Sequence, residues 1–325
     1  MKKRRMVNGD RRRAFTLIEL LVVVSIIALL IAILVPSLNS ARRQAKNAAS
    51  RASIQGLGSG LETFKADTSV GGAYAPSGSD KTDNKGQLEP NVIASPLKND
   101  ANQPLTMVSG ANLLVFAMMG ADLLKTPGFQ DFNRNGTWWD DMHRGTNGAY
   151  ERDATTGEAK RPRVGPFCSD AMTKDLSSVA NMEQAGLVKN PAAHPLSGSV
   201  EMTLPFFVDA FKNPILYYRA RRSASFMVTD PGAKIGVYDH RDNQFLTGTG
   251  GGVGVHFNSK SGHLINGTSA PDATGSPAPI GFSRYILDDK VTARPTPVMR
   301  ETFLLISPGY DGIYGNSDDI TNWTK

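Results

Sequence analysis

The distribution of hydrophobic positions divides the chain into one long apolar run near the N-terminus and a mixed remainder. Residues 15–35 read FTLIELLVVVSIIALLIAILV and contain a single charged side chain, Glu19. A helix rises about 1.5 Å per residue, so this run spans about 30 Å, the hydrocarbon thickness of a bilayer. The pattern therefore predicts a transmembrane helix over residues 15–36.

A second helical pattern follows over residues 37–68. Apolar residues recur there at spacings of three and four, which predicts an amphipathic continuation of the same helix. The members of this stripe are Leu38, Ala41, Ala45, Ala48, Ala52, Leu57, Leu61 and Phe64. Gly56, Gly58 and Gly60 each weaken a helix by up to about 1 kcal/mol relative to alanine, so we expect them to mark a bend or a close packing face.

The remaining residues, 69–325, predict one large domain with long polar segments. An insert over about 78–200 is rich in turn-forming residues, apart from a short buried helix expected at Ala111–Leu124, which Gly120 interrupts. Four short apolar runs predict strands. They are ILYYRA at 215–220, SFMVT at 225–229, RYIL at 284–287 and FLLIS at 303–307. We therefore expect an α+β fold, with the long N-terminal helix packed on a small antiparallel sheet that carries long loop insertions.

Charge changes this picture only at the N-terminus. Residues 1–14 hold seven of the 36 basic side chains and one of the 30 acidic ones, and the other 29 bases and 29 acids cancel. The net charge of +6 thus belongs to a leader, and no nucleic-acid partner is expected, since that would need a basic patch on the folded part. A basic segment before an apolar helix predicts a single-pass membrane protein. Its N-terminus is expected in the cytoplasm and its C-terminal domain on the periplasmic or extracellular side.

Three interpretations of the N-terminal segment compete. An ordinary cleaved secretory signal has an apolar stretch of only about 7–15 residues. A plain signal anchor accounts for the length and the orientation but leaves Glu19 unexplained, because a carboxylate in a membrane helix costs a few kcal/mol. A third interpretation, which accounts for both features, comes from the residues around Glu19.

The segment Ala14-Phe15-Thr16-Leu17-Ile18-Glu19-Leu20 resembles the processing site of type IV prepilins. The resemblance implies that prepilin peptidase cuts between Ala14 and Phe15 and methylates the new N-terminal Phe15. Glu19 then becomes the fifth mature residue, as in the family. Pro36 lies where many members carry a proline that kinks the helix. The segment departs from the family at Ala14, because glycine usually precedes the cut.

This resemblance implies a structural, non-enzymatic subunit of a type II secretion pseudopilus or a type IV pilus-like filament. Its partners are then prepilin peptidase, other pilin-like subunits and the inner membrane. In such a filament Glu19 can pair with the N-terminal ammonium of a neighbouring subunit. The alternative is a membrane-anchored exported binding module for carbohydrate or calcium that uses the prepilin-type leader for delivery. The pair Trp138-Trp139 favours that alternative, since exposed aromatic residues often mark binding surfaces.

The strongest candidate metal site lies at the C-terminus, in residues 307–323. Asp311, Asp318 and Asp319 supply carboxylates there, and two nearby glycines allow the sharp turns that aim main-chain carbonyls inward. The segment resembles the calcium loop of the major pseudopilins of type II secretion, in which the matching aspartates and main-chain carbonyls bind the ion. The alternative is a surface turn with solvated acids.

A second acidic segment contains Asp131, Asn133 and Asn135, followed by a glycine. It matches the first half of a helix–loop–helix calcium loop, but the twelfth position is Met142 rather than glutamate. An ordinary turn is therefore the favoured interpretation.

Motifs that carry catalysis are not evident. The five histidines show no metal-ligand spacing, Cys168 is alone, and no nucleophile elbow or P-loop is present. The ionisable residues of Tyr238–Asp242 are expected on opposite sides of a strand. The sequence therefore predicts no enzymatic activity.

Overall fold

The structure, a computed structural model, divides the chain into two compact units, Met1–Ala45 and Lys46–Lys325, which are described separately. The residues described are 17–78, 108–134, 136, 146–170, 172–185, 187–189, 200–221, 237–247, 256–257, 263–265, 281–291 and 296–323. The expected strand at 225–229 lies outside these residues, as does the pair Trp138-Trp139.

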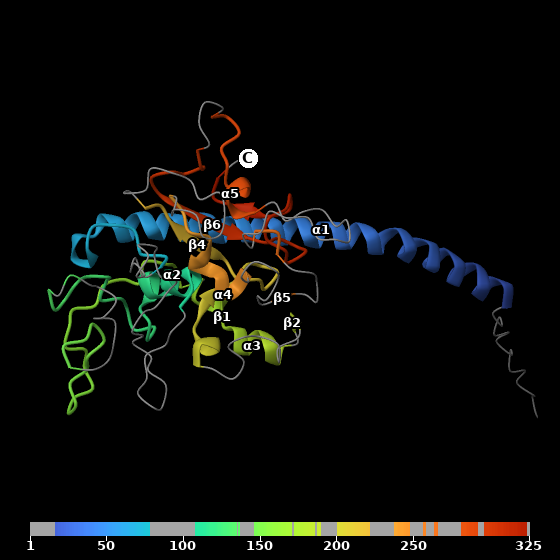
Figure 1. Ribbon diagram of the computed structural model, residues 1–325. Coiled ribbons are helices and arrows are strands. Elements are labelled where there is room, and N and C mark those ends of the chain that lie inside the picture. The colour runs from blue at the N-terminus through green and yellow to red at the C-terminus, as the bar shows by residue number, and fades with distance from the viewer. Residues whose placement is uncertain are drawn as a thin grey trace, which may run out of the picture. The chain divides into compact units, whose positions relative to one another are not determined.

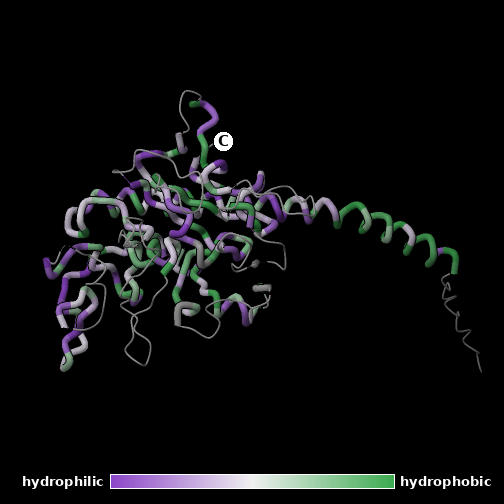
Figure 2. Tube along the Cα trace, viewed as in Figure 1, coloured by the Kyte–Doolittle hydropathy of each residue, from purple (hydrophilic) through white to green (hydrophobic). Residues whose placement is uncertain are grey.

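The described part of the first unit is the N-terminal part of helix α1, which runs from Leu17 to Ala66. Its large apolar side chains are exposed around the whole circumference of the helix from Leu17 to Leu38. Figure 2 shows this stretch as mainly hydrophobic. Only α1, among the described residues, is a helix long and apolar enough to cross a membrane. Pro36 lies within the helix without ending it. Because proline has no N–H, the carbonyl of Ala32 loses its intrahelical donor there.

In the second unit, the C-terminal part of α1 buries one face. Ile54, Leu57, Leu61 and Phe64 are at most 2% exposed, at the spacing that brings residues onto one side of a helix. The predicted stripe is therefore confirmed at its C-terminal end. Its N-terminal members, from Leu38 to Ala52, are exposed.

Gly60 explains part of the glycine pattern on α1. A Cβ at Gly60 would lie 2.3 Å from the carbonyl oxygen of Phe167, so only glycine allows this close backbone contact. A Cβ at Gly58 would approach nothing nearer than 3.8 Å. Of the two expected roles, a close packing face is thus observed at Gly60.

The main sheet has three antiparallel strands in the order β4-β6-β7 (Figure 1). β4 spans Leu216–Arg219, β6 spans Phe303–Ser307 and β7 spans Ile320–Thr321. In the register, Tyr217 lies opposite Leu305 and Ile306 opposite Thr321. This sheet and the long helix confirm the α+β fold and the strands expected at 215–220 and 303–307.

Two further pairs of short antiparallel strands complete the sheet structure. β1 (Leu176–Ser177) pairs with β3 (Phe206–Phe207), and β2 (Val188–Lys189) pairs with β5 (His256–Phe257). Each strand of these pairs has only two residues, so packing rather than the ladder must stabilise them.

The main sheet is buried on both faces. Alternate residues of β6 point to opposite sides. Phe303 and Leu305 join the cluster that contains the buried face of α1, whereas Leu304 and Ile306 join a second cluster. A continuous apolar run such as FLLIS is typical of a strand buried in this way.

Helix α2 (Gly110–Met119) is buried along its whole length. Ser109 caps its N-terminus in a capping box with Asn112, and a Cβ at Gly110 would lie 2.2 Å from the carbonyl oxygen of Tyr217. The short helix expected within Ala111–Leu124 is confirmed, and it ends at Gly120, whose φ is +84°.

The strand expected at 284–287 is wrong. Phe282–Tyr285 forms the short helix α5, whose Phe282 and Tyr285 are buried. The other short helices are η1 (Thr68–Val70), η2 (Met172–Asp175), α3 (Val179–Gln184), η4 (Val200–Thr203), η5 (His240–Asn243) and α4 (Gln244–Thr247).

Candidate functional site

The first candidate site is the N-terminal turn of α1. Glu19 lies in this turn, and its neighbours are exposed apolar side chains such as Leu20, which is 61% exposed. A carboxylate in the first turn interacts favourably with the positive end of the helix dipole. The predicted cleavage residues Ala14 and Phe15 lie outside the described residues.

The other polar side chain deep in this apolar segment is Ser25. Its hydroxyl donates a 2.8 Å hydrogen bond to the carbonyl oxygen of Leu21, so the helix itself satisfies it. Glu19 is thus the ionisable group that the segment Leu17–Val35 carries into apolar surroundings.

The second candidate site is the C-terminal loop between β6 and β7. Gly312 and Gly315 have φ angles of +73° and +104°, which favour glycine. Gly309 also has a positive φ, and a Cβ there would lie 2.3 Å from the carbonyl oxygen of Asp318. The two ends of the loop therefore lie in close contact.

Two of the three predicted carboxylates bond to the main chain or side chains of this loop. Asp311 accepts the N–H of Ile313 at 2.8 Å on Oδ1 and the side-chain amide of Asn316 at 2.7 Å on Oδ2. Asp318 accepts the N–H of Asp311 at 3.3 Å on Oδ2. The loop thus uses both carboxylates to fix its own backbone.

The third carboxylate, Asp319, contacts a different element. Its Oδ2 accepts the N–H of Gly315 at 2.8 Å and the hydroxyl of Tyr285, on α5, at 2.5 Å. Burial raises the pKa of Tyr285, and the nearby charge of Asp319 raises it further, so the hydroxyl remains a donor. Asp319 therefore anchors the loop to α5.

The donor set fits a calcium ion in part. A carboxylate that has accepted one or two hydrogen bonds still has lone pairs for a cation, and the loop offers carbonyl oxygens as well. Within the described ranges, however, no three His, Cys, Asp or Glu side chains form a group that could hold a metal ion. Main-chain oxygens and water would have to supply most of the ligands beside Asp311 and Asp318.

The turn before β4 holds the C-terminal loop in place. The amide of Asn213 donates to the carbonyl oxygen of Gly309 at 2.9 Å, and the hydroxyl of Tyr314 donates to that of Pro214 at 2.7 Å. The N–H of Ala210 donates to Ser50 on α1 at 3.2 Å. The turn thus connects the loop with α1.

The segment around Asp131 forms a closed turn. Asp131 accepts the N–H of Gly136 at 2.7 Å, and Arg134 has a left-handed φ of +52°. Asn133 lies in this turn, whereas Asn135 is outside the residues described. The contact is that of an ordinary turn.

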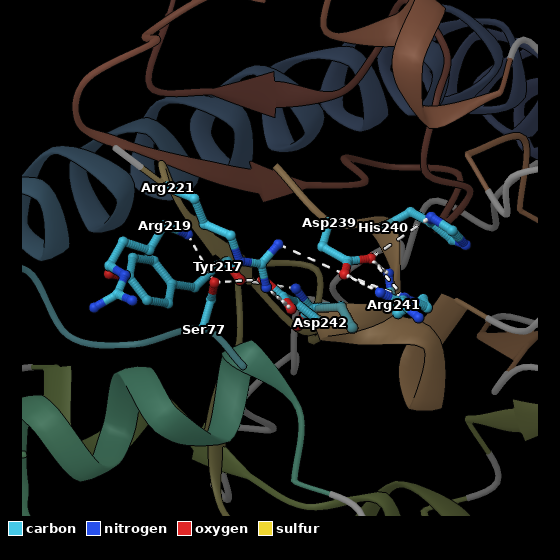
Figure 3. A network of polar contacts seen from close by, with 9 residues as sticks. Ser77, Tyr217, Arg219, Arg221, Asp239, His240, Arg241 and Asp242 are labelled. Atoms are coloured by element: carbon cyan, nitrogen blue, oxygen red, sulfur yellow. Dashed lines mark hydrogen bonds and ion pairs between the residues drawn. The ribbon is translucent and has the colours of Figure 1, made fainter. Parts of the chain in front are cut away.

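A buried ionic network was missed by the sequence analysis (Figure 3). Arg221 pairs with Asp242 at 3.0 Å and with Asp239 at 3.6 Å, and Arg241 pairs with Asp239 at 2.7 Å. Ser77 donates to Asp242 at 2.5 Å. These residues converge because His240–Asn243 is the 3-10 helix η5, so the expected strand at 238–242 is wrong.

The charges of this network are compensated. Burial would raise the pKa of Asp239, but Arg241 and Arg221 together hold it below its usual range. Burial lowers the pKa of His240 despite the opposing effect of Asp239. Because each buried acid has an arginine partner, the arrangement is that of a structural ion-pair network.

Comparison with known proteins decides between the interpretations of the N-terminus. Residues 9–35 match the family model described as the prokaryotic N-terminal methylation motif. The chain carries a prepilin-type signal. This signal, which is that of type IV pilins and pseudopilins, confirms the resemblance seen at Ala14–Leu20. No curated protein and no solved structure matches the chain. The prepilin-type signal and the apolar part of α1 together describe a membrane-anchored protein.

Proposed function

We propose that this protein is a subunit of a type II secretion pseudopilus or a type IV pilus-like filament. Prepilin peptidase cuts it between Ala14 and Phe15 and methylates Phe15, and the domain that follows α1 lies on the outer side of the inner membrane. The observation that carries the proposal is the position of Glu19, in the first turn of an otherwise apolar helix.

The physical argument concerns where that carboxylate can be stable. A charge in lipid costs a few kcal/mol unless it is paired. A cut after Ala14 creates an ammonium group on Phe15, and in a bundle of α1 helices this group can reach Glu19 of a neighbouring subunit. Pairing stabilises the assembled state and selects one axial register of the helices.

A further observation supports assembly. The part of the α1 stripe from Leu38 to Ala52 is exposed, although its small apolar residues have the spacing of a packing face. Small side chains allow helices to approach closely. Neighbouring α1 helices in a filament would cover this face.

The test is the N-terminal residue of the mature protein, read by mass spectrometry on protein from membranes that contain prepilin peptidase. N-methylated Phe15 is the expected result. An N-terminus near Asn39 would indicate an ordinary signal peptidase and would contradict the proposal.

Calcium binding at the C-terminal loop is a second proposal. Asp311 and Asp318 lie together where three glycines allow the backbone to turn inward, which supports a site completed by main-chain oxygens. Asp319 supports the loop from outside through Tyr285. The ion would order the loop between β6 and β7. The turn at Asp131 remains a weaker candidate.

A further inference from the structure

A rigid turn after α2 exposes two adjacent leucines. Leu123 and Leu124 are 44% and 56% exposed, whereas Ala121 just before them is 4% exposed. Beyond α1, few large apolar side chains of the described residues are this exposed. Gly120–Lys125 is called the leucine turn below. The two leucines give this turn an apolar tip.

A partly buried ion-pair cluster holds the leucine turn in its shape. The side chain of Asp122 is 4% exposed and pairs with Arg152 at 3.1 Å and with Arg163 at 3.5 Å. Arg163 also donates to the carbonyl oxygen of Lys125 at 3.2 Å. The turn is therefore fixed before any partner arrives, which lowers the entropic cost of binding.

The backbone of the turn is strained as well. Leu123 has a φ of +58° and Lys125 a φ of +73°, values that residues with a Cβ rarely adopt. A Cβ at Gly120 would lie 2.2 Å from the carbonyl oxygen of Lys125. Strain of this kind persists where the surrounding structure imposes it, and it concentrates at functional contacts.

A cleft of about 780 Å³ lies elsewhere in the same unit, between α1 and the segment after β6. Its apolar lining includes Ile54, Phe303, Ile320 and Trp323. Met299, also in the lining, is 37% exposed and has a strained φ of +50°. We call it the α1 cleft. Its volume lies in the range of about 300–1,000 Å³ that is usual for binding pockets.

The leucine turn and the α1 cleft are complementary in charge. Lys125 is exposed next to the two leucines, and the arginines beneath it outnumber Asp122. The α1 cleft contains the acids Glu62 and Asp319 and one base, Arg51. The cleft has a mixed polar and apolar lining, so its two acids can pair with the cation that flanks the leucines.

We propose that the leucine turn of one copy docks in the α1 cleft of the next copy. The two surfaces differ, so the contact is head-to-tail and leaves a free turn at one end and a free cleft at the other. Repetition of such a contact can generate an open filament. The inference rests on the proposed filament function and assigns it a contact outside the membrane.

Crosslinking of the full chain tests this contact. Cys168→Ser is placed in every version, so that only introduced thiols react. A subunit with Leu124→Cys is produced together with a subunit with Gln55→Cys, which lines the α1 cleft, in cells that process the prepilin. A short bis-maleimide is expected to join the two. Lys174→Cys, also exposed, replaces Leu124→Cys in the matched control and is expected to give at least tenfold less product.

A separate version with Ile27→Cys reports on packing of the α1 helices and distinguishes the two proposals. Ladders from Ile27→Cys together with no Leu124–Gln55 product would overturn the head-to-tail contact and leave the filament standing. A Leu124–Gln55 product without ladders would support the contact and contradict assembly through α1. Loss of both would overturn both. Leu124→Asp is expected to reduce ladders at least tenfold, whereas Val291→Asp, at another exposed apolar residue, is expected to leave them unchanged.

Discussion

The hydroxyl of Ser307 donates a 2.6 Å hydrogen bond to Oδ2 of Asp209, a residue 98 positions earlier in the chain. Asp209 is fully buried, and its Oδ1 accepts the N–H groups of Phe211 and Asn213 at 2.8 and 2.9 Å. One carboxyl group thus joins the end of β6 to the turn before β4. The protonation state of Asp209 therefore affects how firmly the C-terminal loop is held.

Stability is expected to fall as the pH rises through the titration of Asp209. Burial raises the pKa of Asp209 to about 6, against the hydrogen bonds from Ser307, Asn213 and Phe211, which lower it. The folded protein thus binds the proton more tightly than the unfolded chain does. Proton binding by Asp209 therefore adds about 3 kcal/mol to the free energy of unfolding below pH 3.8. This stabilisation is lost as the pH rises through about 6. Urea unfolding between pH 4 and pH 7 measures it.

Asp209→Asn removes the titrating group and keeps an acceptor for both N–H groups. The part of the pH dependence of the free energy of unfolding that comes from Asp209 is therefore expected to vanish. Asp153→Asn is the control. Asp153 is an exposed residue whose pKa is lowered by the N–H groups of Thr156 and Thr155, so its contribution is lost only as the pH falls toward its folded pKa. An unchanged slope in Asp209→Asn would contradict the assignment.

Gly60→Ala is expected to destabilise the protein by about 1–3 kcal/mol, because the new methyl group would overlap the carbonyl oxygen of Phe167. Gly58→Ala, two residues earlier on the same helix, meets nothing nearer than 3.8 Å and is expected to stabilise α1 by up to about 1 kcal/mol. Denaturant midpoints of the two variants give the comparison. If both variants change the stability equally, the close contact between Gly60 and Phe167 does not require glycine.

Glu19→Ala is expected to leave membrane insertion and cleavage intact and to abolish assembly, since it removes the partner of the neighbouring ammonium group. The readouts are the N-terminal residue and the crosslinked ladders from the α1 helix. Ser25→Ala is the control in the same apolar segment, because its hydroxyl donates to the carbonyl oxygen of Leu21 in its own helix and its loss should not affect assembly. Normal filament incorporation of Glu19→Ala would reject the pairing.

Calcium is expected to raise the melting temperature by several degrees. An ion present at about 100 times its dissociation constant stabilises the folded state by about 2.7 kcal/mol. Asp311→Ala should remove the shift, and Asp131→Ala should keep it. Calorimetry with calcium, with magnesium and with a chelator makes the measurement. Absence of any calcium-dependent shift in the parent protein would count against the site.

Arg221→Met is expected to lower the free energy of unfolding by about 3–5 kcal/mol, because it removes a positive charge that pairs with the buried acids Asp239 and Asp242. Arg300→Met is the matched control. Arg300 is 62% exposed at the side chain and its pair with Glu301 spans 3.8 Å, so a change within about 0.5 kcal/mol is expected. Chemical unfolding of both variants tests the difference, and similar losses would argue against a structural network.

The elements predicted correctly are those whose signal is local. The apolar run before Pro36 and the spacing of Leu57, Leu61 and Phe64 follow from helix geometry alone. The strand at 303–307 was evident because a strand buried on both faces is apolar throughout. Residues 284–287 were predicted as a strand because this run leaves out Phe282. With Phe282 included, the buried residues Phe282, Tyr285 and Ile286 have helical spacing.

The candidate sites were predicted less completely, because their partners lie far along the chain. Asp242 meets Ser77 across 165 residues, and Asp319 meets Tyr285 across 34. No local pattern specifies such contacts. The three C-terminal aspartates were expected to act as one set. All three bond to the loop, but Asp319 also accepts the hydroxyl of Tyr285 on α5, a contact that only the tertiary structure determines.

The strand order β4-β6-β7 also affects how the protein can be made. The middle strand, β6, begins at Phe303, so the ribosome synthesises it after almost everything that it joins together. Until then β4 lacks its partner strand, and the buried face of α1 lacks Phe303 and Leu305. The main sheet can therefore close only after the chain has been synthesised through β6. A chain truncated before Phe303 would lose the centre of its sheet and would be exposed to proteases during biogenesis.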